Sequence, residues 1–214
     1  MDKKFLVILA VALVGLFGLF YFTTDKNKTN TASTSSNATV SNHSIGKNSK
    51  NVELLVYGDF QCPVCGEFYT VEKAVVEKYQ NEIKFTFRHF PLDTIHPNAR
   101  AAHRAAEAAG KQNKFFEMYD LIYQNQKVWS DSANPKPIFD SYAQQIGLKA
   151  DQFSSDYASE IVNSTINADK AEGTAKQVQG TPTFYINGTK IDNGQLSSVE
   201  AFSKVIDEYI AKQK

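Results

Sequence analysis

The chain contains 214 residues, of which 42% are hydrophobic, and its 23 Lys and Arg residues balance its 23 Asp and Glu residues. The basic residues are not clustered, which argues against nucleic acid or an acidic polymer as a partner. Its two cysteines, Cys62 and Cys65, lie three positions apart, so a zinc site of four thiolates is excluded.

An uncharged run of 18 residues, Phe5 to Phe22, follows Lys3 and Lys4. At ~1.5 Å per residue a helix of this length reaches roughly 27 Å, close to the ~30 Å hydrocarbon core of a bilayer. The run ends in bulky aromatic residues rather than in the small residues of a signal cleavage site. We therefore predict that residues 1–22 are an uncleaved signal anchor that exports the rest of the chain.

Residues 23–50 are rich in Ser, Thr, Asn and Lys and show no hydrophobic periodicity. Such a segment cannot bury enough apolar surface to offset the entropy lost on ordering. We predict a flexible linker between the anchor and a folded domain.

Residues 51–214 are enough for one domain with a hydrophobic core. A nearly continuous apolar run at 52–57 predicts a strand buried on both faces. Apolar residues at helical spacing then predict a helix that begins at or near Cys62. Alternating residues at 83–88 predict a half-buried strand.

The C-terminal part of the chain again shows the patterns of strands followed by a helix. Apolar residues at 184–186 and a second short segment at 189–191 flank Asn187-Gly188, which is typical of a tight hairpin. Residues 199–209 carry the apolar stripe of a last helix. Between the two halves, residues 95–178 have helical spacing, so an α/β fold with an inserted helical region is expected.

The motif Cys62-Pro63-Val64-Cys65 stands where the first strand gives way to the predicted helix. A thiol at a helix N-terminus lies beside unpaired N–H groups and the positive end of the helix dipole, and both stabilise a thiolate. We predict Cys62 as the attacking thiolate and Cys65 as the buried thiol that resolves a mixed disulfide. Pro63 suits the first helical turn. The two intervening residues, Pro63 and Val64, are expected to tune the pKa of the first thiol most strongly, and they supply no imidazole or charge that would stabilise its thiolate further.

The alternative for this pair is a purely structural disulfide. A loop this short gains little stability from a cross-link, which favours redox chemistry. No cofactor is expected beyond the redox-active disulfide of Cys62 and Cys65.

A second motif, Gly180-Thr181-Pro182-Thr183, leads straight into the strand at 184–186. Together with the upstream Cys pair and the order of elements, it resembles the thioredoxin superfamily, in which a cis-proline loop faces the redox pair. The helical insertion, the anchor and the lead-in at 59–65 resemble more narrowly the DsbA-like thiol:disulfide oxidoreductases, particularly the membrane-anchored ones of Gram-positive bacteria.

The resemblance implies a thioredoxin-like fold, in which Pro182 is the cis residue and the backbone of Thr181 hydrogen-bonds an extended substrate. Family members commonly carry an acidic residue six positions before the first Cys, where this chain has Val56. Asp59 stands three positions before Cys62, and we expect that it at most tunes the pair.

Three histidines, His89, His96 and His103, invite a metal site with the cysteines. The spacing of His96 and His103 predicts instead a solvated polar face of one helix, which also carries Glu107, so no metal is expected. His89 is expected at a strand end, where the chain turns into the insertion.

We predict an enzyme outside the cytoplasmic membrane that introduces disulfides into exported proteins with free thiols. By the resemblance, a quinone-linked thiol oxidase of the membrane reoxidises it. A reductase or isomerase of the same fold is the alternative, because Pro63 and Val64 are less obviously oxidising than a pair with a histidine. A tethered, non-enzymatic metal-binding module is a further alternative from another class.

Overall fold

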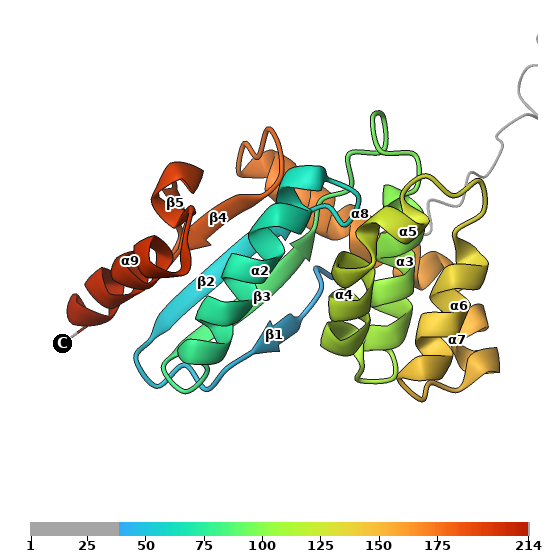
Figure 1. The fold of residues 1–214 in the computed structure, drawn as a ribbon, viewed down its shortest axis with the longest axis horizontal. Coiled ribbons are helices and arrows are strands. Elements are labelled where there is room, and N and C mark those ends of the chain that lie inside the picture. Colours follow the sequence, from blue (N-terminus) through green and yellow to red (C-terminus); the bar gives the residue numbers. More distant parts are fainter. Residues whose placement is uncertain (1–38, 214) are drawn as a thin grey trace, which may run out of the picture. The chain divides into compact units, whose positions relative to one another are not determined.

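A five-stranded sheet lies at the centre of the fold (Figure 1). The computed structural model describes residues 39–213. β2 runs parallel to β3, whereas the other neighbouring strands are antiparallel. In the order of the sheet, the strands are β1 (His43–Ile45), β3 (Ile83–His89), β2 (Val52–Gly58), β4 (Thr183–Ile186) and β5 (Thr189–Ile191).

Helices cover both faces of this sheet. On one face, Phe184 of β4 contacts both Phe68 of α2 (Pro63–Lys78) and Phe202 of α9 (Val199–Ala211). On the other face lies α8 (Glu160–Ala175), and a Cβ atom on its Gly173 would lie only 2.7 Å from Phe90. Because both faces are covered, the continuous apolar pattern predicted for the first strand is confirmed in β2.

The predicted helical insertion is confirmed, and it contains six helices. α3 lies in the middle of them and packs against α4, α6, α7 and α8. Two of these helices, α5 and α7, are short, and so few residues carry little hydrophobic periodicity. The helices that precede α8 are α3 (Ala99–Gly110), α4 (Phe115–Gln124), α5 (Gln126–Trp129), α6 (Lys136–Gln145) and α7 (Ala150–Ala158).

The end of the predicted linker is wrong, because residues 41–50 belong to the folded domain. β1 pairs with the edge of β3, with Ile45 opposite Phe85. The backbone N–H of Lys47 then donates to the carbonyl of Gln80 at 2.8 Å. A strand of three residues is too short to leave a recognisable pattern in the sequence. It is ordered because it pairs with β3, which is distant in the sequence.

The predicted anchor, residues 1–22, lies outside the described residues, as do residues 23–38 of the linker. Within residues 39–213, no helix has the length and apolar character needed to cross a bilayer. The predicted hairpin is confirmed: Asn187 and Gly188 both have positive φ values, 48° and 78°, as a tight turn of this kind requires. A short 3₁₀ helix, η1 (Asn193–Leu196), then leads to α9.

Candidate active site

The two cysteines occupy the first turn of α2. Cys62 is the N-cap residue, with extended backbone angles, and Pro63 is the first helical residue. The backbone N–H of Cys62 donates to the carbonyl of Asp59, which fixes the turn from β2 into the helix. Both cysteines are free thiols, and both are largely covered by their surroundings. The predicted helix start is therefore confirmed, and it places Cys62 beside the unpaired N–H groups of the first turn.

The surroundings of Cys62 stabilise its thiolate. A hydrogen bond from the Cys65 thiol is the main reason that the pKa of Cys62 falls from 9.0 to about 6. Burial opposes this shift, and the Thr181 side chain and the N–H groups of Val64 and Cys65 add to it. The buried Thr181 hydroxyl has no hydrogen-bond partner among residues 39–213, so it is free to face the Cys62 sulfur. Well over half of the protein would therefore carry a Cys62 thiolate at neutral pH.

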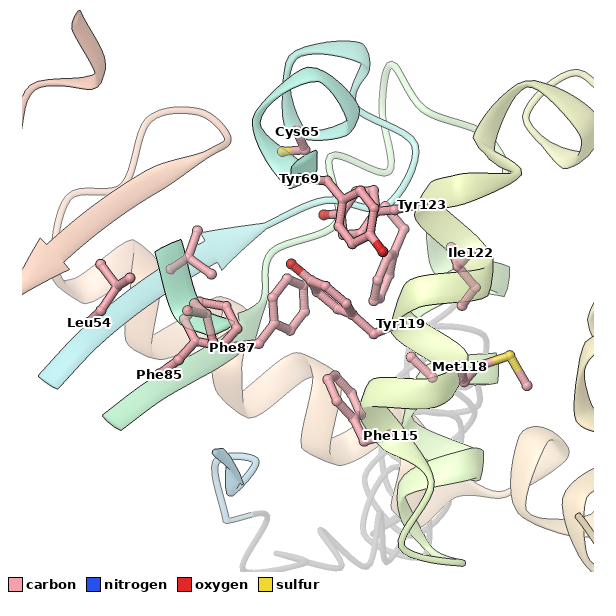
Figure 2. Packing of buried hydrophobic residues seen from close by; sticks show 14 of the residues in the cluster. Leu54, Cys65, Tyr69, Phe85, Phe87, Phe115, Met118, Tyr119, Ile122 and Tyr123 are labelled. Atoms are coloured by element: carbon pink, nitrogen blue, oxygen red, sulfur yellow. The ribbon is translucent and has the colours of Figure 1, made fainter. Parts of the chain in front are cut away.

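Cys65 has the opposite character. Its deep burial, followed by the influence of Cys62, raises its pKa well above 9.0. Figure 2 shows it above a group of aromatic side chains that includes Tyr69 and Tyr123. These rings belong to the same hydrophobic core as the Cys65 side chain. The two thiols therefore differ as an attacking and a resolving thiol should.

The second motif lies directly opposite Cys62. The Thr181–Pro182 peptide bond is cis, and Cys62 Sγ lies 3.4 Å from the Thr181 carbonyl oxygen. Two side chains hold the loop: the Asn193 amide donates to the Pro182 carbonyl, and the Thr183 hydroxyl donates to the Gly180 carbonyl. The loop and the cysteine pair thus form one site, although they lie 119 positions apart in the chain.

Comparison with known proteins places this site in a family. The family described as Thioredoxin matches residues 38–208. The chain belongs to the thioredoxin family. Among curated relatives of this thioredoxin-family protein, the "Probable disulfide bond formation protein D" of Bacillus cereus is 31% identical over 176 residues, which are 79% of each chain.

Other relatives are much longer. The Na⁺/H⁺ antiporter NhaA 1 of Salinispora arenicola is 32% identical over 169 residues, which cover 79% of this chain but only 25% of the antiporter. This thioredoxin-family protein thus spans about a quarter of the length of the antiporters that it matches.

Solved structures show the same fold. Oxidised BdbD from Bacillus subtilis has a TM-score of 0.68 at 19% identity, with 78% of this chain and 92% of that chain covered. The thiol-disulfide exchange protein α-DsbA2 from Wolbachia pipientis has a TM-score of 0.65 at 19% identity, with coverages of 77% and 85%. The predicted resemblance to the DsbA-like thiol:disulfide oxidoreductases is confirmed.

Val56 occupies the place at which members of this family commonly carry an acid. It is 2% exposed and lies in β2 between Phe87 of β3 and Phe184 of β4. The position is therefore part of the apolar core here.

The Asp59 side chain is buried. It contacts the loop that follows β3 and makes no hydrogen bond to a cysteine sulfur among the described residues. Its carboxylate accepts hydrogen bonds from the backbone N–H of Gln61 and of Leu92, at 2.8 and 2.9 Å, and contacts His96 Nδ1 at 2.7 Å. Burial would raise its pKa, but His103, His96 and Leu92 together lower it to about 2. Asp59 acts on the cysteines through its backbone: its carbonyl accepts from the N–H of Cys62, and its N–H opposes the rise of the pKa of Cys65.

Replacing Asp59 by Asn should therefore destabilise the protein more than it alters the thiols. The amide has one acceptor where the carboxylate has two, so a buried donor is left without a partner, at about 1–3 kcal/mol. The lowered pKa also means that the stabilisation by Asp59 is present above pH 3.8 and is lost as the pH falls through about 2. Urea unfolding at pH 7 measures the loss of stability. The rate of Cys62 alkylation against pH measures the effect on the thiols.

Asp93→Asn is the matched control, because Asp93 pairs with Arg100 and Lys170 in a partly exposed position. It should change stability by only a few tenths of a kcal/mol. If Asp59→Asn shifts the pKa of Cys62 strongly and leaves the stability unchanged, the structural role assigned to Asp59 is wrong. Asp59 would then act directly on the pKa of Cys62.

The prediction of a solvated face for the histidine row is wrong. His103 and Glu107 lie on α3 and are buried, with exposed fractions of 0% and 3%. His96 precedes this helix and lies against Asp59. The reason is tertiary, since α3 is surrounded by other helices of the insertion and by the end of the sheet. The prediction that His89 ends a strand is confirmed, because it is the last residue of β3.

Proposed function

We propose that this protein is an extracytoplasmic thiol:disulfide oxidoreductase that introduces disulfides into exported proteins. The observation that carries the proposal is the unequal pair of thiols, Cys62 with a lowered pKa and Cys65 with a raised one, opposite the Thr181-Pro182 loop. The names of the Bacillus cereus relative and of the solved neighbours, which are disulfide-forming or thiol-exchanging proteins, agree with it.

The reaction moves two electrons from a substrate dithiol to the enzyme disulfide. A substrate thiolate attacks the Cys62 sulfur of the disulfide, and Cys65 leaves as the thiol. The second substrate thiolate then attacks the substrate sulfur of this mixed disulfide and displaces Cys62. Because a thiol of low pKa is a good leaving group, a pKa of about 6 speeds the second step.

The same pKa favours the oxidising direction. A stabilised Cys62 thiolate lowers the free energy of the reduced enzyme, and a pair whose reduced form is stabilised accepts electrons more readily. Pro63 and Val64 are exposed and uncharged, so the stabilisation comes from Cys65, Thr181 and the helix N-terminus. The Thr181-Pro182 loop, whose strand follows directly, is the proposed binding place for an extended substrate segment.

The proposed location rests on the uncharged run at residues 5–22. A single-pass anchor would hold the domain on the outer side of the cell membrane, where thiols of exported proteins become available. The proposed partner for reoxidation is a quinone-linked thiol oxidase of the same membrane. No cofactor other than the Cys62–Cys65 disulfide is needed for this cycle.

The redox potential of the pair tests the direction of the reaction. The full chain, in detergent, is equilibrated with mixtures of reduced and oxidised glutathione, and the fraction of Cys62–Cys65 disulfide is measured by alkylation. We expect a potential above about −200 mV. A value near that of thioredoxin, about −270 mV, would contradict the oxidase and favour the reductase.

A further inference from the structure

All four histidines of the chain lie in one network with two carboxylates, in which His89 and His103 are buried and His43 and His96 are half-buried. His43 of β1, His89 of β3 and Glu107 of α3 form its outer part, and their ligand atoms lie within 4.8 Å of one another. His103 connects this part to Asp59, and His96 lies on the far side of Asp59. His43, His89 and Glu107 take no part in the proposed thiol chemistry.

From this geometry we propose that His43, His89 and Glu107 bind a divalent transition metal ion of the Zn²⁺ type. Two imidazole nitrogens and one carboxylate oxygen are the donor set of an open, four-coordinate zinc site, with water as the fourth ligand. A set in which nitrogen predominates is unsuited to Ca²⁺ or Mg²⁺, which take oxygen ligands.

The three side chains are already gathered around one point. Glu107 Oε2 lies 2.5 Å from His43 Nε2 and 3.1 Å from His89 Nε2. One oxygen of Glu107 therefore faces both imidazole nitrogens, as a shared ligand position requires.

The rings are held in place by their neighbours. The His43 ring stacks on Phe115, with centroids 3.6 Å apart and planes within 7°. His89 is fully buried, and its other ring nitrogen, Nδ1, lies 2.7 Å from His103 Nδ1. A metal-binding histidine almost always uses its second nitrogen in this way, to fix the ring and its tautomer.

One buried nitrogen of the network is left without a hydrogen-bond partner. His103 Nε2 has no hydrogen bond to any described residue, and it lies 3.8 Å from Asp59 Oδ1. A metal on His89 Nε2 would leave the ring proton of His89 on Nδ1, which would donate to His103 Nδ1, so that the His103 proton would lie on Nε2 and point toward Asp59.

The site also has room and access. A cavity of about 720 Å³ adjoins His43 and Glu107, so an ion and a water ligand can reach them. Lys111 Nζ lies 3.6 Å from the other oxygen of Glu107, but this side chain is 37% exposed and can turn into solvent. Bound metal would join β1, the end of β3 and α3, and would thereby fix the segment that enters the domain.

The test uses the full chain with Cys62 and Cys65 both replaced by serine, so that no thiolate can bind the metal and thiol exchange plays no part. Co²⁺ is titrated as a coloured substitute for Zn²⁺, and Zn²⁺ is then used to displace it. We expect one ion per chain, the intense visible absorption of a four-coordinate site, and a rise of the melting temperature with Zn²⁺.

Three variants in this background locate the ion. His43→Gln and Glu107→Gln should each weaken Co²⁺ binding by at least about tenfold. His96→Gln is the matched control, because His96 is not a ligand, and it should change the affinity by less than about threefold. Circular dichroism checks that each variant is folded. Because His43 is near the surface, His43→Gln alone is enough to test the proposal if Glu107→Gln does not fold.

Two results would overturn the proposal. One is the absence of saturable Co²⁺ or Zn²⁺ binding by the serine variant, which would leave the cluster a hydrogen-bond network only. The other is binding that His43→Gln leaves unchanged. Neither result bears on the proposed oxidase, because the cysteines are absent from the experiment.

Discussion

Replacing Cys62 by serine is expected to reduce dithiol–disulfide exchange to the background rate of the buffer, whereas Cys65→Ser should retain the first step and stop there. In the reduced Cys65→Ser protein, Cys62 can attack a disulfide such as those of insulin, but no second thiol releases it. The expected product is a stable mixed disulfide, seen by mass spectrometry as an adduct at Cys62. The opposite pKa shifts of the two thiols are the reason for this difference.

The pH dependence of the unmodified pair checks the same assignment. Because the thiolate is the nucleophile, alkylation of Cys62 in the reduced protein should accelerate as the pH rises and should reach half of its maximal rate near pH 6. Cys65 should not react in this range. A mixed disulfide through Cys65, or residual exchange in Cys62→Ser, would contradict the assigned roles.

The local part of the site could be predicted from the sequence. The change from an apolar run to helical spacing around Cys62 is a local signal, and so is the turn at Asn187-Gly188. The placement of Thr181 opposite Cys62 was available only through the resemblance, since no local pattern connects residues so far apart.

Burial of polar residues is what the sequence could not show. His103 and Glu107 stand four positions apart on a helix, which in a single sequence looks like an exposed row. Their burial depends on the helices packed around α3. Glu107 contacts His43 and His89, which come from two different strands, and His103 Nδ1 contacts His89. No signal in the sequence shows this burial, because His43 lies in a segment without a recognisable pattern and no local pattern connects His89 to α3.

Glu72 is a second buried polar residue of this kind, and it should make the protein less stable as the pH rises. It lies on α2 and is 4% exposed, and its carboxyl group accepts a hydrogen bond from the Tyr119 hydroxyl. Burial is the main reason that its pKa rises from 4.5 to about 8; the Tyr119 bond opposes the shift and Asp120 adds to it. Figure 2 shows Tyr119 extending from α4 into the group of buried aromatic side chains.

The sign follows from proton binding. Between pH 4.5 and about 8, Glu72 stays protonated in the folded protein and is ionised in the unfolded chain. The folded state therefore binds more protons, and the free energy of unfolding falls by up to about 1.4 kcal/mol for each pH unit. The stabilisation is complete below pH 4.5 and is lost as the pH rises through about 8, with about 2–3 kcal/mol lost between pH 5 and pH 7.

Glu72→Gln should remove this slope, because the amide does not titrate. Its oxygen can still accept from Tyr119, and a cavity of about 140 Å³ beside residue 72 has room for water at the amide nitrogen. We expect similar stability of the parent and the variant at pH 5, and a variant more stable by about 2 kcal/mol or more at pH 7. Urea unfolding at pH 5, 7 and 8 measures both.

The background for this comparison must lack both cysteines, because the lowered pKa of Cys62 gives stability a slope of the opposite sign above pH 6. Both proteins therefore carry Cys62→Ser and Cys65→Ser. Glu77→Gln is the matched control on the same helix, since the Glu77 side chain is 66% exposed and pairs loosely with Lys73 at 3.9 Å. It should leave the slope unchanged. A slope that persists in Glu72→Gln would show that the buried carboxyl group is not its source.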